Sequence, residues 1–156
     1  MLIDAYTVVP TSEVEFKFEC DCDSGIIKKV VRYDLLSTKL GDKDLYNLAF
    51  GPYNEDGKIL DSKKTNTNDL LKTLATVAKT SIYFTEAYTN VAIYAKGYNE
   101  ARTRLYQIHI HKFYDEIHEN FIIYGLRKNY PYELFKKERN YNYGRFFSRK
   151  KNSLKN

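Results

Sequence analysis

The chain has 156 residues, of which 43% are hydrophobic and 29% charged, and its formal net charge is +5. This composition excludes a disordered chain and favours one soluble domain with a single core. No apolar run approaches the roughly eighteen residues of a membrane span, and the first residues, MLIDAYTVVP, lack the basic region of a signal peptide. We therefore expect a cytoplasmic protein with no membrane partner.

The positive charge is concentrated at the C-terminal end. Residues 139–156 contain six basic residues and no acidic one, which leaves a net charge of −1 on residues 1–138. We therefore divide the chain into a single α+β domain, 1–138, and a basic aromatic C-terminal segment, 139–156, that is partly docked and has flexible last residues. Any electrostatic attraction to nucleic acid must come from that segment or from a local patch.

The first half of the chain predicts an antiparallel sheet. Apolar and polar residues alternate in EVEFKFEC (13–20), which gives a strand one buried and one solvated face. The turn CDSG leads into a hairpin partner, and a weaker strand precedes the pair. The other strands predicted here are LIDAYTVV (2–9), IIKKVVRYDLL (26–36) and LYNLAFGPY (45–53), the last followed by the turn NEDGK.

The second half changes to helical periodicity. Apolar residues at i, i+3, i+4 and i+7 predict an amphipathic helix from Asn68 to Tyr88, and a second helix follows from Asn99 to about Asn120. Strands are predicted at NVAIYAKG (90–97), FIIYGLRK (121–128) and YPYELF (130–135). This order predicts an α+β fold, with a mixed, largely antiparallel sheet and both helices packed on one face.

The stretch AKGYNEARTRLY (95–106) predicts an anion site where the second helix begins. A glycine allows close backbone approach, and the first N–H groups and the helix dipole favour negative charge. Arginine side chains can form paired hydrogen bonds to a phosphate. The candidate residues are Lys96, Gly97, Asn99, Arg102 and Arg104. The alternative is structural, with Arg102 paired to a carboxylate of the sheet.

A metal site is a second hypothesis for the same helix. His111, Asp115 and His118 follow one another at i, i+4 and i+7, which places them on one helix face. Such a set can hold a divalent ion, with water as the remaining ligands. The alternative is a solvated polar face that carries histidines. We expect no other cofactor.

The C-terminal segment RNYNYGRFFSRKKNSLKN interleaves aromatic and basic residues. This pattern is typical of contacts to single-stranded RNA or DNA, in which bases stack on rings and cations bind phosphates. The same residues also fit a last strand, YGRFFSR, docked on the domain. The candidate binding residues are Tyr141, Tyr143, Arg145, Arg149, Lys150 and Lys151.

Several of these segments resemble a small uncharacterised bacterial family, a domain of unknown function. The resemblance lies in YNLAFGPYNEDGKILD, LLKTLATVA, IYAKGYNEARTRLYQI, FIIYGLRKN and RNYNYGRFFSRKK, which together span residues 46–150. NLAFGPYNEDGKILD and AKG…ARTRLY are specific as a pair. The resemblance implies a single-domain protein of this length and no established activity.

Three functions fit these patterns. The first is a non-enzymatic RNA- or DNA-binding protein that uses the basic aromatic segment and the arginines at the helix start. The alternative is a protein-interaction component of a toxin–antitoxin or phage-defence module, which binds another protein or a second copy of itself. The third is a phosphate-handling enzyme or nuclease. Because no complete catalytic constellation is present, we favour a protein without enzymatic activity.

Overall fold

The structure is a computed structural model that describes residues 4–22, 25–60, 67–96, 100–136, 138, 139, 141 and 143–150. It has an eight-stranded mixed sheet, mostly antiparallel, in the order β1-β2-β3-β4-β5-β8-β6-β7, and three helices. The predicted α+β class is therefore confirmed. The elements are β1 (Val9–Pro10), β2 (Glu15–Cys22), β3 (Gly25–Leu40), β4 (Lys43–Pro52), α1 (Thr67–Ala87), β5 (Val91–Ala95), α2 (Glu100–Lys112), α3 (Tyr114–His118), β6 (Phe121–Gly125), β7 (Glu133–Leu134) and β8 (Arg145–Arg149).

The chain forms two compact units. Unit 1 consists of Met1–Asp34 and Leu48–Tyr88, and unit 2 consists of Leu35–Asn47 and Thr89–Asn156. The long strands β3 and β4 each contribute residues to both units.

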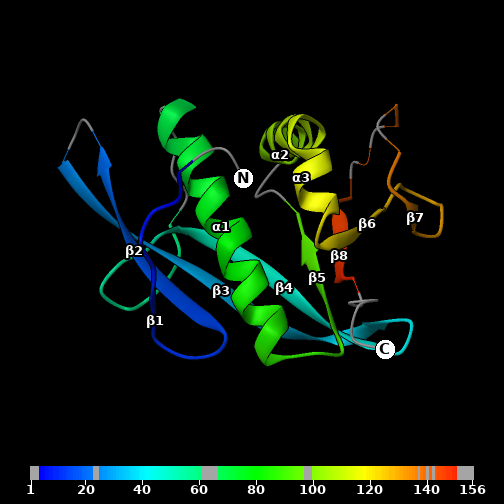
Figure 1. Ribbon diagram of the computed structural model, residues 1–156, viewed down its shortest axis with the longest axis horizontal. Helices are drawn as coiled ribbons and strands as arrows, with labels where there is room; N and C mark the ends of the chain where they lie inside the picture. The colour runs from blue at the N-terminus through cyan, green and yellow to red at the C-terminus, as the bar shows by residue number, and fades with distance from the viewer. Residues whose placement is uncertain are drawn as a thin grey trace. The chain divides into compact units, whose positions relative to one another are not determined.

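Unit 1 is built from a meander of strands covered by α1, which crosses β2 and β3 in Figure 1. The alternation in β2 buries Phe16 and Phe18 toward the helix, as the sequence predicts. The ring of Tyr33 on β3 stacks on Phe84 of α1 with 4.2 Å between centroids. Such ring pairs add to the burial of apolar area that holds the helix on the strands.

The buried face of α1 is rich in hydroxyl groups as well as apolar side chains. Thr73, Thr76, Thr80 and Thr85 are all at most 5% exposed. The Thr76 and Thr85 hydroxyls donate to carbonyls one turn earlier, at 2.7 and 2.8 Å. Because the helix itself satisfies these hydroxyls, they can be buried at low cost.

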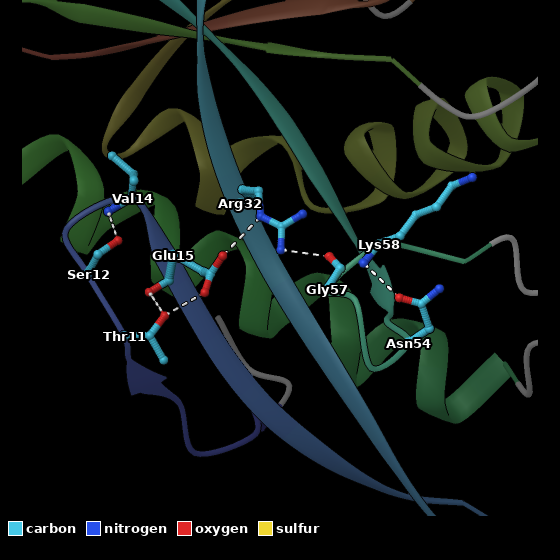
Figure 2. Close-up of polar contacts among 8 residues, drawn as sticks. All are labelled: Thr11, Ser12, Val14, Glu15, Arg32, Asn54, Gly57 and Lys58. Atoms are coloured by element: carbon cyan, nitrogen blue, oxygen red, sulfur yellow. Dashed lines mark hydrogen bonds and ion pairs between the residues drawn. The ribbon is translucent and has the colours of Figure 1, made fainter.

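A polar network fastens the loop after β4 to the meander (Figure 2). Arg32 on β3 donates from Nε to Glu15 on β2 at 3.0 Å and from Nη2 to the carbonyl of Gly57 at 3.0 Å. Glu15 also accepts from Thr11 Oγ1 at 2.8 Å. Within the loop, Asn54 Oδ1 accepts from the backbone N–H of Lys58 at 2.9 Å. The loop that begins at residue 53 is therefore held in one position.

This network predicts a pH dependence of stability. The hydrogen bond from Thr11, and then Arg32, holds the pKa of Glu15 below its ordinary value of 4.5, although partial burial opposes them. A carboxylate whose pKa is lowered on folding stabilises the fold above its unfolded pKa, and this contribution is lost as the pH falls through the folded pKa. We expect Glu15→Gln to destabilise the protein at pH 7 and to have a progressively smaller effect as the pH falls below the ordinary pKa of 4.5. Urea unfolding over this pH range measures the effect, and an effect that does not change with pH would contradict the expectation.

Unit 2 is centred on β8, which lies between β5 and β6 and is antiparallel to both. Its side chains alternate between two clusters. Phe146 packs with Leu40, Leu45 and Ala92, while Phe147 packs against the cluster of Ile123, Phe135 and Tyr141 together with residues of α2 and α3. Residues 145–149 thus adopt the strand alternative of the two that the sequence leaves open for the C-terminal segment.

The predicted second helix is interrupted. It was expected to run without a break to about Asn120, but α2 ends at Lys112 and α3 begins at Tyr114. Phe113 between them has φ −109° and ψ 20°, outside the range of a regular helix. The hydrogen bonds Phe113 N–H to His109 O and Ile117 N–H to Phe113 O continue across it, both at 3.0 Å. The interruption is therefore a local distortion within one helical segment.

Candidate nucleic-acid interface

Three strands of unit 2 reach the same end of the sheet. Arg145, the first residue of β8, pairs with Ala95 at the end of β5 and with Gly125 at the end of β6. The chain then continues the pairing beyond β6, because Leu126 N–H donates to Gly144 O at 3.1 Å and Tyr143 N–H donates to Leu126 O at 3.2 Å. The residues that directly follow β5 and β6 and precede β8 are therefore brought together at this end.

We call this surface the basic aromatic end and define it by Lys96, Arg127, Lys128, Tyr130, Tyr132 and Tyr143. The three tyrosines are 55%, 45% and 40% exposed, in that order. Lys96 Nζ lies 5.5 Å from the centroid of the Tyr143 ring, and the Arg127 guanidinium carbon lies 4.0 Å from that of Tyr130. Both distances fit cation–π contacts. Two cations thus lie against exposed tyrosine rings in the residues that follow β5 and β6.

A single carboxylate balances part of this charge. Glu133 on β7 accepts from Arg127 Nη2 at 3.0 Å, from Arg139 Nη1 at 3.0 and 3.1 Å, and from the Tyr141 hydroxyl at 3.4 Å. Burial tends to raise the pKa of Glu133, but Arg139 and Arg127 outweigh it and hold the pKa below its ordinary value of 4.5. The carboxylate is therefore ionised at neutral pH. One negative charge faces two arginines, so the surroundings stay positive.

The residues predicted at the start of the second helix are only partly described. Lys96 and Arg104 are exposed, and Lys96 belongs to the basic aromatic end. Gly97 and Asn99 lie outside the described residues, as does the side chain of Arg102. The predicted anion site at that helix start therefore stays a prediction.

The C-terminal residues predicted to bind nucleic acid divide into surface and interior. Tyr143 is exposed, while Arg149 packs over the ring of Phe121 at 5.9 Å. Lys150 Nζ lies 3.2 Å from His118 Nδ1. Lys151 lies outside the described residues.

Tyr141 and Arg145 are in the interior, where they are 0% and 1% exposed. The Tyr141 ring lies directly over Gly125, and its hydroxyl oxygen accepts from the backbone N–H of Lys136 at 3.0 Å. Burial raises the pKa of Tyr141. Neither side chain is therefore part of the exposed surface on which a base could stack.

The three predicted metal ligands are not brought together. His111 packs edge-on against Phe135 with 5.3 Å between centroids, and His118 stacks on Tyr114 at 5.2 Å. The distortion at Phe113 falls between His111 and Asp115. Over the described residues, no group of three or more His, Cys, Asp or Glu side chains is placed to hold a metal ion.

Sequence reasoning missed most of the basic aromatic end. Arg127, Lys128, Tyr130 and Tyr132 follow β6 in the stretch LRKNYPYE, which has the same mixture of rings and cations as the C-terminal segment. That mixture is a usable signal. The apolar residues of the same stretch also fit the predicted strands 121–128 and 130–135, which conceals the signal.

A second cationic and aromatic surface lies in unit 1. A groove of about 580 Å³ is lined by Tyr6, Lys17, Lys28, Tyr53 and Lys72, among other residues. Lys17 Nζ lies 5.0 Å from the Tyr53 centroid and Lys72 Nζ lies 4.5 Å from that of Tyr6. Tyr53 directly follows β4 and stands at the start of the loop that Arg32 fastens through Gly57. These residues come from separate segments of unit 1, so no local sequence pattern could reveal the groove.

The fold and these surfaces define a small α+β protein with positively charged aromatic surfaces. A family described as a family of unknown function, DUF6934, matches residues 3–151, and the chain belongs to this family. The resemblance drawn from the sequence is thereby confirmed. No curated protein and no solved structure matches the chain. In the described parts of the chain, each helix is too short or too polar to cross a lipid bilayer.

Proposed function

We propose that this protein binds single-stranded nucleic acid, RNA in the first place, without catalysing a reaction on it. The observation that carries the proposal is the basic aromatic end, where the exposed rings of Tyr130, Tyr132 and Tyr143 stand among Lys96, Arg127 and Lys128. Proteins that bind single strands combine stacking rings with cations that follow the phosphates.

The chemistry of each residue type suits one part of a nucleotide. A base stacked on an exposed tyrosine contributes about 1–3 kcal/mol, and it does so with little sequence preference because every base has a ring face. A lysine or arginine that contacts a phosphate releases a condensed counterion. Lys96 now lies over the Tyr143 ring, so a base that stacks there would free its ammonium group for the adjacent phosphate.

The groove of unit 1 supports the same proposal with an independent set of residues. It combines two tyrosine rings with three lysines, against the single carboxylate of Glu19. A concave surface of this composition favours a flat, negatively charged ligand, which is the chemistry of a nucleotide.

The proposal is tested by fluorescence anisotropy of a labelled single-stranded RNA with the full-length protein. We expect Tyr130→Ala and Tyr143→Ala each to weaken binding by about 1–3 kcal/mol, because each removes one stacking ring. The control must be a tyrosine outside the strands, which excludes Tyr46 of β4. Tyr83→Ala is the matched control, because Tyr83 is an exposed tyrosine of unit 1 (43%) outside both surfaces. Equal affinities for the three variants would contradict the proposal.

A further inference from the structure

Arg145 is an arginine in the interior of unit 2 that has no carboxylate partner among the described residues. It is 1% exposed and is the largest of the fully buried side chains. Its Nε and Nη2 atoms are buried and have no hydrogen-bond partner within the described part of the chain. Among the described residues, the ion pairs of unit 2 involve Lys39, Arg127 and Arg139, but not Arg145.

The carboxylate closest to Arg145 in the strand register is that of Glu133, which is already hydrogen-bonded to other side chains. Glu133 and Arg145 both pair with Gly125, from opposite sides of β6, so their side chains leave the same face of the sheet. Between them the Tyr141 ring fills the space above Gly125. Glu133 binds Arg127, Arg139 and the Tyr141 hydroxyl instead.

The ring of Phe135 is the contact that Arg145 does make, with 5.9 Å between the guanidinium carbon and the ring centroid. A cation–π contact offsets only part of the free energy needed to bury a charge. Burial lowers the pKa of Arg145 to about 10. The group therefore stays protonated at neutral pH, and a buried cation requires an anion or several hydrogen-bond acceptors.

We propose that Arg145 is the centre of a binding site for one phosphate-type oxyanion. The fork of guanidinium donors matches the oxygens of such an ion. Another cation adjoins the position, because Arg127 follows the strand partner Gly125 by two residues and donates to Glu133, whose side chain leaves the same face as that of Arg145. This site goes beyond the proposed function, since binding at the exposed surface does not use a buried arginine.

The site is tested by thermal unfolding in phosphate and in chloride at equal ionic strength, without nucleic acid. We expect inorganic phosphate at one hundred times its Kd to raise the Tm of the wild-type protein by about 5 °C or more. Arg145→Met should lose this shift. In chloride it should unfold at a higher temperature than the wild type, because a methionine in place of an unpaired buried charge is stabilising.

Two further variants make the result decisive. Arg149→Met is the matched control, because Arg149 is four residues further along the same strand and its side chain leaves the same face of the sheet. This variant should keep the increase in Tm with phosphate. Arg145→Lys keeps the charge without the fork and should weaken phosphate binding at least tenfold, even if Arg145→Met does not fold. No shift in the wild-type protein, or a full shift in Arg145→Lys, would overturn the proposal.

The source of the phosphate is decided by comparing RNA with a 5′-phosphate and RNA with a 5′-hydroxyl. Tighter binding of the phosphorylated RNA, lost in Arg145→Lys, would support a terminal phosphate of nucleic acid as the ligand. Equal binding of both, with the inorganic phosphate shift present, would support a small phosphate compound. Because the phosphate shift is measured without RNA, failure of the RNA-binding proposal leaves this test intact.

Discussion

Replacing Lys29 with methionine should lower the free energy of unfolding by about 3–5 kcal/mol. Lys29 on β3 and Asp69 in the first turn of α1 form an ion pair at 2.7 Å, with side chains 9% and 11% exposed. Lys29 Nζ also lies 3.2 Å from the Thr73 hydroxyl. Loss of the lysine would leave the Asp69 carboxylate in the interior with the Tyr6 hydroxyl at 2.7 Å and without a cation. Urea unfolding measures the change.

The double variant Lys29→Met, Asp69→Asn distinguishes the loss of the ion pair from the loss of one charge alone. When both charges are absent, no uncompensated charge remains in the interior, so the double variant should be more stable than the sum of the two single changes predicts. Lys39→Met is the matched control, because Lys39 forms an exposed pair with Asp44 at 3.5 Å and should change stability by about 0.5 kcal/mol or less. If the changes in unfolding free energy of Lys29→Met and Asp69→Asn add up to that of the double variant, the two residues are not coupled and the expectation is wrong.

Gly125→Ala should destabilise the protein by about 1–3 kcal/mol, a large effect for one methyl group. A Cβ at this position would lie 2.2 Å from Cδ1 of Tyr141. The backbone at Gly125 cannot shift easily, because it is paired with a neighbouring strand on each side. The Tyr141 ring cannot shift easily either, because it is fully buried. Thermal unfolding, together with the near-ultraviolet signal of the tyrosines, measures both the loss and the displacement of the ring.

The same substitution in a Tyr141→Ala background supplies the control. Once the ring is absent, the added methyl group has space, and Gly125→Ala should cost about 0.5 kcal/mol or less. If the cost is the same in both backgrounds, the close approach of Tyr141 to Gly125 is not the cause. This pair also matters for the oxyanion proposal, since the ring separates Arg145 from Glu133.

The period-two alternation of β2 and the helical periodicity of α1 were sufficient to predict the architecture. Phe16 and Phe18 lie in the core as the alternation requires. The predicted helix from Asn68 to Tyr88 is the observed Thr67–Ala87 within one residue. These elements were predictable because burial of one face leaves a regular pattern in the sequence.

Other features depend on tertiary contacts that leave no such pattern. The threonines of α1 are buried because their hydroxyls bond to the helix backbone, so a polar residue there says little about exposure. Tyr141 and Arg145 resemble surface residues of a basic segment, yet β8 is a central strand of unit 2. Its position between β5 and β6 requires pairing across distant parts of the chain, which local composition cannot indicate.

The position of β8 also governs how the C-terminal segment can be studied. A truncation after residue 138 would delete a strand paired on both sides, so loss of binding would reflect loss of the fold. Removal of residues 151–156 keeps β8. This shorter truncation tests Lys151 and Lys155 with every residue of β8 still present.

The salt dependence of RNA binding tests the central claim most directly. The Kd is measured by anisotropy over a range of salt concentrations for the wild type, for the triple variant Lys96→Gln, Arg127→Gln, Lys128→Gln, and for a control, Lys39→Gln, Lys58→Gln, Lys112→Gln, with the same net charge. Each phosphate contact contributes about −0.7 to the slope of log K against log salt for a single strand, so the first triple variant should reduce the slope by about 2. The control should keep the wild-type slope. Equal slopes for all three proteins, or no binding by the wild type, would contradict a nucleic-acid interface at the basic aromatic end.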